Sequence, residues 1–171
     1  MQLNFPDKTD KELVFNNVTD YLTRLNIKIE KKDDTRPWGG FFVIDELESE
    51  NFISLYFPHL TKNELTISGK LSPKILVVAP QKRLSWQYHH RRAEIWKLIG
   101  GTAGVVISDT DDEKETKHLK IGDIIQLKQG ERHRLIGLDG WGIIAEIWRH
   151  TNAAHPSDED DIVRVQDDFG R

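Results

Sequence analysis

The stretch RLSWQYHHRRAEIWKLIGG, residues 83–101, decides the fold. Gln87 and His89 are two positions apart, so on a β-strand their side chains lie on the same face. A turn that contains two arginines follows, and Glu94 then begins a second apolar run that ends at Gly101. If the two runs pair as a hairpin, an amide oxygen, an imidazole and a carboxylate converge on one side of it. These three groups are ligands for a divalent cation of borderline hardness.

A fourth candidate ligand lies downstream, in the stretch GDIIQLKQGERH of residues 122–133. A strand in this stretch turns at Gly130 and then presents His133. The two stretches together therefore predict a metal site built from side chains that are distant in the sequence.

Length and composition restrict the class of protein. The 171 residues, 37% of them apolar, form one domain, residues 1–171, with enough apolar residues for a sizeable core. The formal net charge of −4 gives no sign of a nucleic-acid binder, so we expect no nucleic-acid partner. The lack of cysteine excludes disulfides and thiolate metal sites and fits a reducing compartment. No signal-peptide pattern and no apolar run of the ~18 residues that span a bilayer occur, so we expect a cytoplasmic protein without a membrane partner.

The N-terminal extension, residues 1–35, is expected to add a helix to the domain. Thr9 has the position of an N-cap in a capping box, with Glu12 three residues later. Apolar residues then recur at helical spacing, at Val14, Val18, Tyr21, Leu22 and Leu25. We predict a helix over residues 9–25 that packs on the outside of the fold, with a dimer contact as the alternative.

From Trp38 onwards the apolar residues occur in short runs that turn residues separate. This pattern is typical of an all-β sandwich or barrel, and the lack of alternating strands and helices argues against a parallel α/β sheet. We expect the barrel to occupy residues 36–150 and part of the acidic tail, residues 151–171, to dock on it. Outside the opening stretch, the predicted strands cover residues 41–44, 52–57, 65–67, 75–79, 103–107, 124–127, 133–136 and 141–148.

Residues 87–94 and 122–133 resemble the two signature halves of the cupin superfamily. The first half has the form X-x-His-(x)4-Glu, with Gln87 where cupins usually have histidine. The second half has the form Gly-(x)5-Pro-x-Gly-xx-His, with Lys128 where the proline would be. The resemblance implies a cupin fold, which is a jelly-roll barrel, although a fold alone does not give a function.

Further motifs resemble the type II mannose-6-phosphate isomerase cupin, which is often the C-terminal part of a bifunctional mannose-1-phosphate guanylyltransferase. The matching motifs are RPWG at 36–39, LSWQYH at 84–89, RAEIW at 92–96, GTA at 101–103, EDDIVR at 159–164 and DFGR at 168–171. Residues 1–35 have no counterpart in that family. The segments before Leu84 and between Glu146 and Glu159 are longer than in the family, which leaves the substrate more open than the fold. The glycine-rich nucleotidyltransferase motif is absent, so we expect no pyrophosphorylase activity.

This resemblance implies that Gln87, His89, Glu94 and His133 bind a metal. Two neutral imidazoles, a neutral amide and one carboxylate leave a divalent site net positive, which suits an anionic substrate. Zinc is the first choice, and manganese, iron, cobalt or nickel fit the same ligands. The implied reaction interconverts mannose-6-phosphate and fructose-6-phosphate through an enediolate, whose charge the cation stabilises. The alternative is that the two histidines are ordinary residues of a metal-free barrel.

The general base is expected on the last strand. Glu146 and Trp148 share one face of it, and a carboxylate in a semi-apolar interior can have a raised pKa and accept a proton. The alternative is that Glu146 forms a salt bridge or faces solvent.

The substrate phosphate needs cations with forked donors. Arg92, two residues before Glu94, is the first candidate for this role and for catalysis, and Arg132 and Arg134 beside His133 come next. Trp96 lies on the Glu94 face, where it can stack on the sugar or simply form part of the core.

Other functions stay open on the sequence alone. Another phosphorylated sugar, such as a heptose phosphate, would use the same chemistry. A sugar-binding or regulatory cupin would keep the pocket without turnover, and an iron oxygenase would use a similar set of histidines and a carboxylate. By analogy with other cupins, we expect a homodimer that binds a small phosphorylated sugar.

Overall fold

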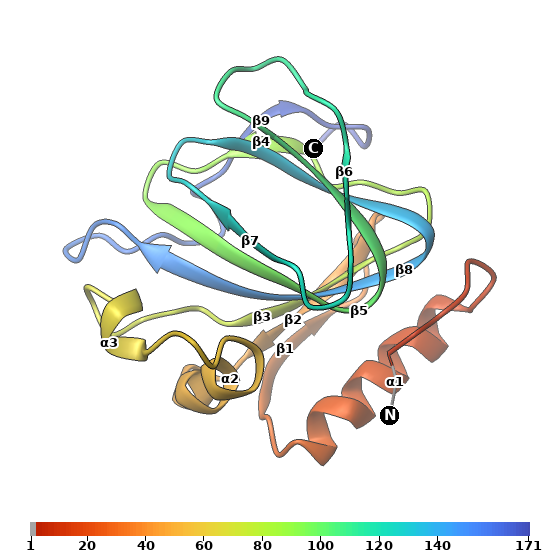
Figure 1. Ribbon diagram of the computed structural model, residues 1–171, viewed down its shortest axis with the longest axis horizontal. Coiled ribbons are helices and arrows are strands. Elements are labelled where there is room, and N and C mark those ends of the chain that lie inside the picture. Colours follow the sequence, from red (N-terminus) through yellow and green to blue (C-terminus); the bar gives the residue numbers. More distant parts are fainter. Residues whose placement is uncertain (1–2) are drawn as a thin grey trace.

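Two long antiparallel strands, β5 (Arg92–Ser108) and β8 (Arg132–His150), pair along their whole length and form the centre of the molecule (Figure 1). The structure is a computed structural model that describes residues 3–171. On one side of β8 the order is β3, β2 and β1, and near its start β8 also pairs with β4, which pairs with β9. On the other side, β5 pairs with β6 and β7. The shorter strands are β1 (Ile29–Asp33), β2 (Gly39–Ile44), β3 (Lys74–Val78), β4 (Trp86–Tyr88), β6 (Lys117–Leu119), β7 (Ile124–Leu127) and β9 (Val163–Gln166).

The sheet curls into the all-β barrel that the sequence predicts. Strand β3 is buried on both faces, because its residues pack alternately inside and outside the barrel. Leu76 and Val78 lie in the interior apolar cluster with Trp96 and Leu98. Ile75 and Val77, like Ile143, Ala145 and Ile147 of β8, lie in a second cluster that the helices cover. Successive residues of one strand therefore serve two cores.

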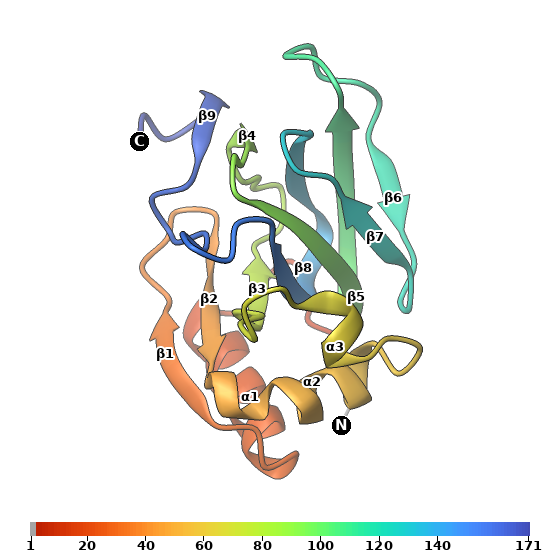
Figure 2. The same ribbon diagram turned by 90° about the vertical axis from the view of Figure 1, so that its left-hand side faces the viewer.

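The helices lie together on the outer face of β1–β3 (Figures 1 and 2). They are α1 (Lys11–Arg24), the short 3-10 helix η1 (Glu46–Glu48), α2 (Ser49–Tyr56) and α3 (Lys62–Leu65). Phe15 of α1 stacks on Phe42 of β2, with ring centroids 5.3 Å apart. No helix within residues 3–171 is long and apolar enough to cross a membrane.

Several local predictions are wrong. The N-cap of α1 is Asp10 rather than Thr9, since the Asp10 carboxylate accepts a hydrogen bond from the Glu12 amide. Of the predicted strand 52–57, residues 52–56 belong to α2 and Phe57 is its C-cap, and the segment predicted as the strand 65–67 contains the end of α3. A short apolar run does not distinguish a strand from a buried helix face. Conversely, the charged stretch before Pro37 contains the edge strand β1, whose charges protect an unpaired edge.

The pairing predicted for the stretch 83–101 is also wrong. Strand β4 pairs with β8 and β9, and β5 does not turn back on β4. Nor does β5 end at Gly101, because bulges on either side of this residue carry it past the double glycine. Gly101 has φ +66°, and a Cβ there would lie 1.7 Å from the Trp141 carbonyl oxygen, so only glycine fits the bulge. Likewise β8 runs without a break across the connector expected near residue 138.

The C-terminal tail packs against the barrel. Strand β9 adds to β4, with Arg164 directly opposite Gln87. Arg83 and Asp168 form a two-pronged ion pair, with distances of 2.6 and 2.9 Å. The tail therefore forms one wall of the space beside β4, where the candidate ligands lie.

Candidate functional site

A cavity of about 400 Å³ lies between the inner face of the barrel and the C-terminal tail. Its wall combines aromatic side chains with both signs of charge. The residues that carry this character are Arg36, Trp38, Phe41, Lys74, Gln87, Arg92, Glu94, Trp96, Glu146, Trp148, Glu159, Asp160, Arg164 and Arg171. A cavity of this size with convergent polar groups fits a small polar ligand.

Three of the four predicted metal ligands meet at one end of this region. The candidate ligand atoms of His89, Glu94 and His133 all lie within 4.8 Å of one another, and all three residues are buried. His89 Nε2 is 3.1 Å from Glu94 Oε1, and His133 Nε2 is 3.3 Å from Glu94 Oε2. The residues come from three segments: the end of β4, the start of β5 and the start of β8. In the β5–β8 pairing Glu94 is opposite Trp148 and His133 is opposite Ile107, so the two ligands come from opposite ends of the ladder and meet because the sheet curls into a barrel.

The hydrogen bonds of the two imidazoles show which nitrogens face the centre as acceptors. His89 Nδ1 lies 2.6 Å from the Asp161 carbonyl oxygen, and His133 Nδ1 lies 2.9 Å from the Glu131 carbonyl oxygen. A carbonyl can only accept, so each Nδ1 carries the proton and each neutral ring turns the Nε2 lone pair toward Glu94. Burial lowers the pKa of His89, which favours this neutral form.

This arrangement leaves the centre short of positive charge. Glu94 Oε2 and His133 Nε2 are both buried, and neither has a hydrogen-bond partner among residues 3–171. Two such acceptors facing each other in a dry interior are costly unless a cation lies between them. Two imidazole nitrogens and a carboxylate form a donor set suited to zinc or another first-row divalent metal. The residues present therefore fit a bound divalent cation.

The fourth predicted ligand, Gln87, lies beside these three on the cavity wall. It is directly opposite His133 in the β4–β8 pairing. Its amide oxygen accepts a hydrogen bond of 2.5 Å from the Ser85 hydroxyl. Gln87 is therefore positioned to act as a neutral metal ligand. The hydroxyl of Ser85, which lies on the same face of the strand, orients its amide group.

Arg92 lies against the ligands, with its donors engaged by protein groups. Its Nε donates to Glu94 Oε1 at 2.7 Å, and its Nη2 lies 3.1 Å from His89 Nε2. Its Nη1 donates to Ser157 Oγ at 2.9 Å and to the Asp158 carbonyl at 3.0 Å. The guanidinium also lies over the Trp148 ring, 3.7 Å from its centroid. The structure therefore gives Arg92 the position of a group that orients Glu94.

Glu146 faces the same cavity and forms no ion pair within residues 3–171. It is buried, and its Oε1 accepts a hydrogen bond of 2.9 Å from the Trp96 indole N–H. Trp96 of β5 and Lys74 of β3 lie opposite it on the two neighbouring strands. Burial, with the nearby charge of Glu94, raises the pKa of Glu146 to about 7. A carboxyl group with such a pKa can accept and return a proton near neutral pH.

Cations that the sequence did not single out lie around the cavity. The guanidinium of Arg164 in β9 forms no hydrogen bond or ion pair among the described residues, and partial desolvation and the nearby Arg171 lower its pKa. Arg36 repels the same guanidinium and is itself paired with Asp33. Lys74 is buried, lies 3.9 Å from the Trp148 ring centroid and pairs with Glu159. A group of cationic side chains, one of which has no acidic partner, is typical of a site that binds an anion.

The two other predicted phosphate ligands lie elsewhere in the part of the chain that the structure describes. Arg132 pairs with Asp111 and lies over the Tyr88 ring, 4.1 Å from its centroid. Arg134 is fully buried, and its guanidinium binds Glu113, Gln166 and the Leu84 carbonyl. Neither residue lines the cavity. Along a strand the residues directly before and after an inward-facing side chain point outward. Because His133 faces inward, its neighbours Arg132 and Arg134 cannot bind a phosphate inside the barrel.

Some residues that line the cavity were not predicted as site residues, although they lie in sequence motifs that point to them. Arg36, Arg164 and Arg171 belong to motifs already noted at 36–39, 159–164 and 168–171, but no role was assigned to them. Lys74 stands in a buried strand, where a charged residue is rare without a partner or a function. His150, for which we predicted no function, is buried at the end of β8, and burial lowers its pKa to about 4.

Comparisons with known proteins give the family and agree with the fold. A family model described as "Mannose-6-phosphate isomerase C-terminal" matches residues 45–167. Alginate biosynthesis protein AlgA of Pseudomonas aeruginosa is 31% identical over 127 residues, which are 72% of this chain and 24% of AlgA. Mannose-1-phosphate guanylyltransferase ManC of Salmonella typhimurium is 30% identical over 136 residues, 80% of this chain and 22% of ManC. The chain thus spans about a quarter of the length of these relatives.

Solved structures share the fold. The capsular polysaccharide assembling protein CapF of Staphylococcus aureus superposes with a TM-score of 0.52 at 10% identity, over 82% of this chain and 34% of that one. At this identity the likeness concerns the fold alone, which is that of a cupin. Together with the family match over most of its length, this places the chain in the family of mannose-6-phosphate isomerase C-terminal cupin domains.

Proposed function

We propose that this protein is a metal-dependent aldose–ketose isomerase that interconverts mannose-6-phosphate and fructose-6-phosphate. The observation that carries the proposal is the pairing, in one cavity, of a candidate metal centre with a buried carboxyl group that has no ionic partner among the described residues. The family relationship agrees with it. An isomerase of this kind needs a Lewis acid, a base of near-neutral pKa and a cationic site for the phosphate.

The metal would be held by His89, Glu94 and His133, with Gln87 beside them. When bound, a divalent cation would supply the positive charge that stabilises oxygen anions on the sugar. Zinc is our first choice for these ligands, followed by manganese, iron, cobalt and nickel.

Glu146 would move the proton between the two carbons. As a carboxylate it takes the proton from C2 of the aldose, while the C1 carbonyl oxygen gains the electron pair. As a carboxylic acid it returns that proton to C1, while the proton of the C2 hydroxyl passes to the C1 oxygen. C2 then becomes the carbonyl of the ketose and C1 carries the hydroxyl group. Its hydrogen bond from Trp96 fixes the direction of the carboxyl group, and the protein has the same protonation state before and after the cycle.

The sugar phosphate would bind at the cations of the tail. Arg164 offers a guanidinium without a protein partner within residues 3–171. Arg171 and Arg36 lie close enough to lower its pKa by charge repulsion. A phosphate held there neutralises their mutual repulsion, and forked guanidinium donors match its oxygens. In this account Arg92 orients the metal ligand Glu94, and the phosphate is bound by other arginines.

An iron oxygenase is the second candidate, because two histidines and one carboxylate are also the ligands of non-haem iron enzymes. The cavity contains two features that such a reaction does not require, namely the unpaired Glu146 and the group of arginines around Arg164. They are the reason for preferring the isomerase. Turnover of the sugar phosphate separates the two candidates.

The first prediction concerns the reaction itself. Purified protein should convert mannose-6-phosphate to fructose-6-phosphate, lose this activity after chelator treatment and regain it with zinc or another divalent ion. A coupled assay for fructose-6-phosphate measures it. Protein that is shown to contain metal but converts neither mannose-6-phosphate nor other phosphosugars would reject the isomerase proposal.

The second prediction concerns Glu146. Glu146→Gln keeps an acceptor for the Trp96 N–H but removes the base, so kcat should fall by about 10²-fold or more. Because the folded-state pKa of about 7 lies above the ordinary value of 4.5, ionisation of Glu146 costs more free energy in the folded than in the unfolded protein. The wild type should therefore lose this contribution to stability as pH rises through that interval.

Urea unfolding of chelator-treated protein at about pH 5 and pH 8 measures the effect. The variant should gain stability relative to the wild type as pH rises. Glu115→Gln, an exposed residue of the loop after β5, is the matched control and should change neither activity nor the pH dependence. Equal pH profiles for wild type and Glu146→Gln would show that Glu146 ionises normally.

The third prediction concerns the phosphate. Arg164→Ala should raise KM for mannose-6-phosphate by roughly 10- to 100-fold, because a hydrogen-bonded charge contact contributes about 1.5–3 kcal/mol. Metal content should stay unchanged. Arg149→Ala, an exposed arginine of β8 outside the cavity, is the control. An unchanged KM for Arg164→Ala would place the phosphate elsewhere.

A further inference from the structure

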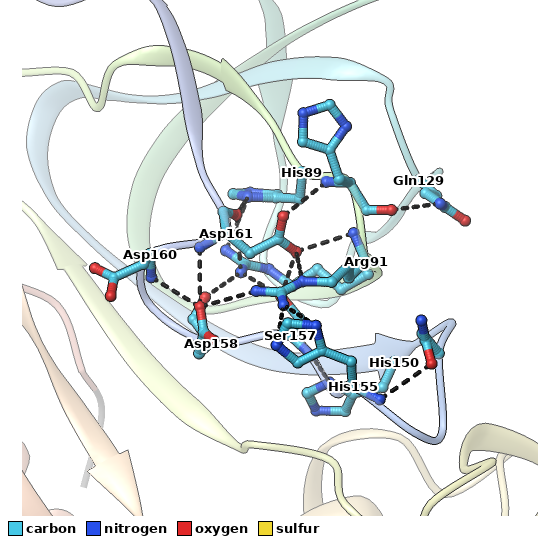
Figure 3. Close-up of polar contacts among 12 residues, drawn as sticks. His89, Arg91, Gln129, His150, His155, Ser157, Asp158, Asp160 and Asp161 are labelled. Carbon is cyan, nitrogen blue, oxygen red and sulfur yellow. Dashed lines mark hydrogen bonds and ion pairs between the residues drawn. The ribbon is translucent and has the colours of Figure 1, made fainter.

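The segment between β8 and β9 contacts the candidate metal ligands from outside the barrel strands. We call residues 157–161 the C-terminal strap. In Figure 3 its residues Ser157, Asp158 and Asp161 lie beside His89 and Arg91, with dashed lines joining the two groups. The sequence predicts that part of the acidic tail docks on the barrel, and in this segment Ser157 and Asp161 are buried.

Asp161 binds the turn after β4 through both its side chain and its backbone. Its Oδ1 accepts from the His90 amide and its Oδ2 from the Arg91 amide, each at 2.9 Å. Its carbonyl oxygen lies 2.6 Å from His89 Nδ1. The carboxylate thus fixes the backbone on one side of His89, while the carbonyl fixes the tautomer and orientation of the ring.

The strap also reaches the second ligand through Arg92. Ser157 Oγ and the Asp158 carbonyl accept from Arg92 Nη1, and Arg92 Nε donates to Glu94. Ser157 Oγ donates in turn to Asp161 Oδ2 at 2.6 Å. One short segment therefore orients His89 directly and Glu94 through a single intervening residue.

The strap has its own internal structure, so it can act as a unit. The Asp158 carboxylate accepts from the amides of Asp160 and Asp161 at 3.1 and 3.0 Å. The Ser157 amide donates to His150 Nδ1 at 2.9 Å, which attaches the start of the strap to the end of β8. Between these points the strap has no strand pairing, and it contacts the turn after β4, Arg92 and, through Glu159, Lys74 of β3.

We infer that the C-terminal strap is a positioning element of the metal centre, so that docking of the strap and binding of the metal strengthen each other. A docked strap holds two ligands in place before the metal arrives, which lowers the cost of ordering them. Thermodynamic linkage then requires the reverse effect of equal size, namely that bound metal holds the strap down. The inference rests on the proposed metal centre and is independent of the reaction that the centre supports.

The test measures zinc affinity and strap protection in the full chain. Zinc binding is measured by competition with a chromophoric chelator, and hydrogen exchange is followed over residues 151–162 with and without zinc. Asp161→Ala should weaken zinc binding by about 10- to 100-fold. Zinc should slow exchange of the strap in the wild type, and this effect should shrink in the variant.

Two further variants separate positioning from general stability. Asp161→Asn keeps one acceptor for the turn, and Ser157→Ala keeps the Asp161 contacts to the turn and removes only the hydroxyl donor, so both should fold and show intermediate losses of zinc affinity. Asp123→Ala is the matched control, because its carboxylate also accepts from a backbone amide, that of Lys120, in a turn away from the site. It should lower stability without changing zinc affinity.

Each outcome decides between the claims. Equal zinc affinity for wild type and the Asp161 and Ser157 variants, or strap exchange that zinc does not change, would overturn the inference while the metal centre stands. Wild-type protein that binds no zinc at this site would overturn the inference and the metal centre together. Zinc binding with the expected coupling but without sugar-phosphate turnover would contradict only the proposed reaction.

Discussion

Two imidazole nitrogens and a carboxylate face one another inside the barrel with more acceptors than donors. Both histidines donate an Nδ1–H to a backbone carbonyl, which in the neutral tautomer leaves Nε2 as an acceptor facing Glu94. Arg92 donates to one Glu94 oxygen, and among the described residues the other oxygen and His133 Nε2 have no hydrogen-bond partner. A divalent cation would resolve this imbalance, and the surrounding hydrogen bonds hold the three residues in place.

The scaffold explains how such a costly arrangement persists. Strands β5 and β8 pair over their full length, so the ligands Glu94 and His133 sit on the most extensively paired part of the fold. The same two strands place Trp96 and Glu146 opposite each other farther along the barrel. The register therefore sets Trp96 against Glu146, and the curl of the same two strands brings Glu94 to His133. The tail supplies the carbonyl partner of His89 and Arg164, whose guanidinium has no partner among the described residues. Rigid strands carry the proposed chemistry, and the docked tail adds ligand orientation and charge.

The sequence predicted the parts of this account that depend on local spacing. The two-residue period placed Glu146 and Trp148 on one face, and both line the cavity. The barrel class followed from short apolar runs and turn residues. Contacts between distant segments were beyond such reasoning, because no local pattern shows that β4 pairs with β8 and β9 or that Asp161 reaches His89.

Errors arose where one pattern allowed two structures. Phe52 and Ile53 form an apolar pair that suits a strand or a helix, and tertiary packing against the outer face of the sheet selects the helix. Arg132 and Arg134 were chosen for their closeness to His133 in the sequence, but a strand turns their side chains away from it. Docking of part of the acidic tail was expected, but not that carboxylates of residues 157–161 would accept hydrogen bonds from backbone amides.

The central claim is that a cation binds where these acceptors meet. Crystals of the wild-type protein grown with zinc, with diffraction recorded at the zinc absorption edge, test it directly. The account predicts a strong anomalous peak in contact with His89, Glu94 and His133. Zinc bound only at other residues, with those three side chains in contact with one another and no peak between them, would contradict it.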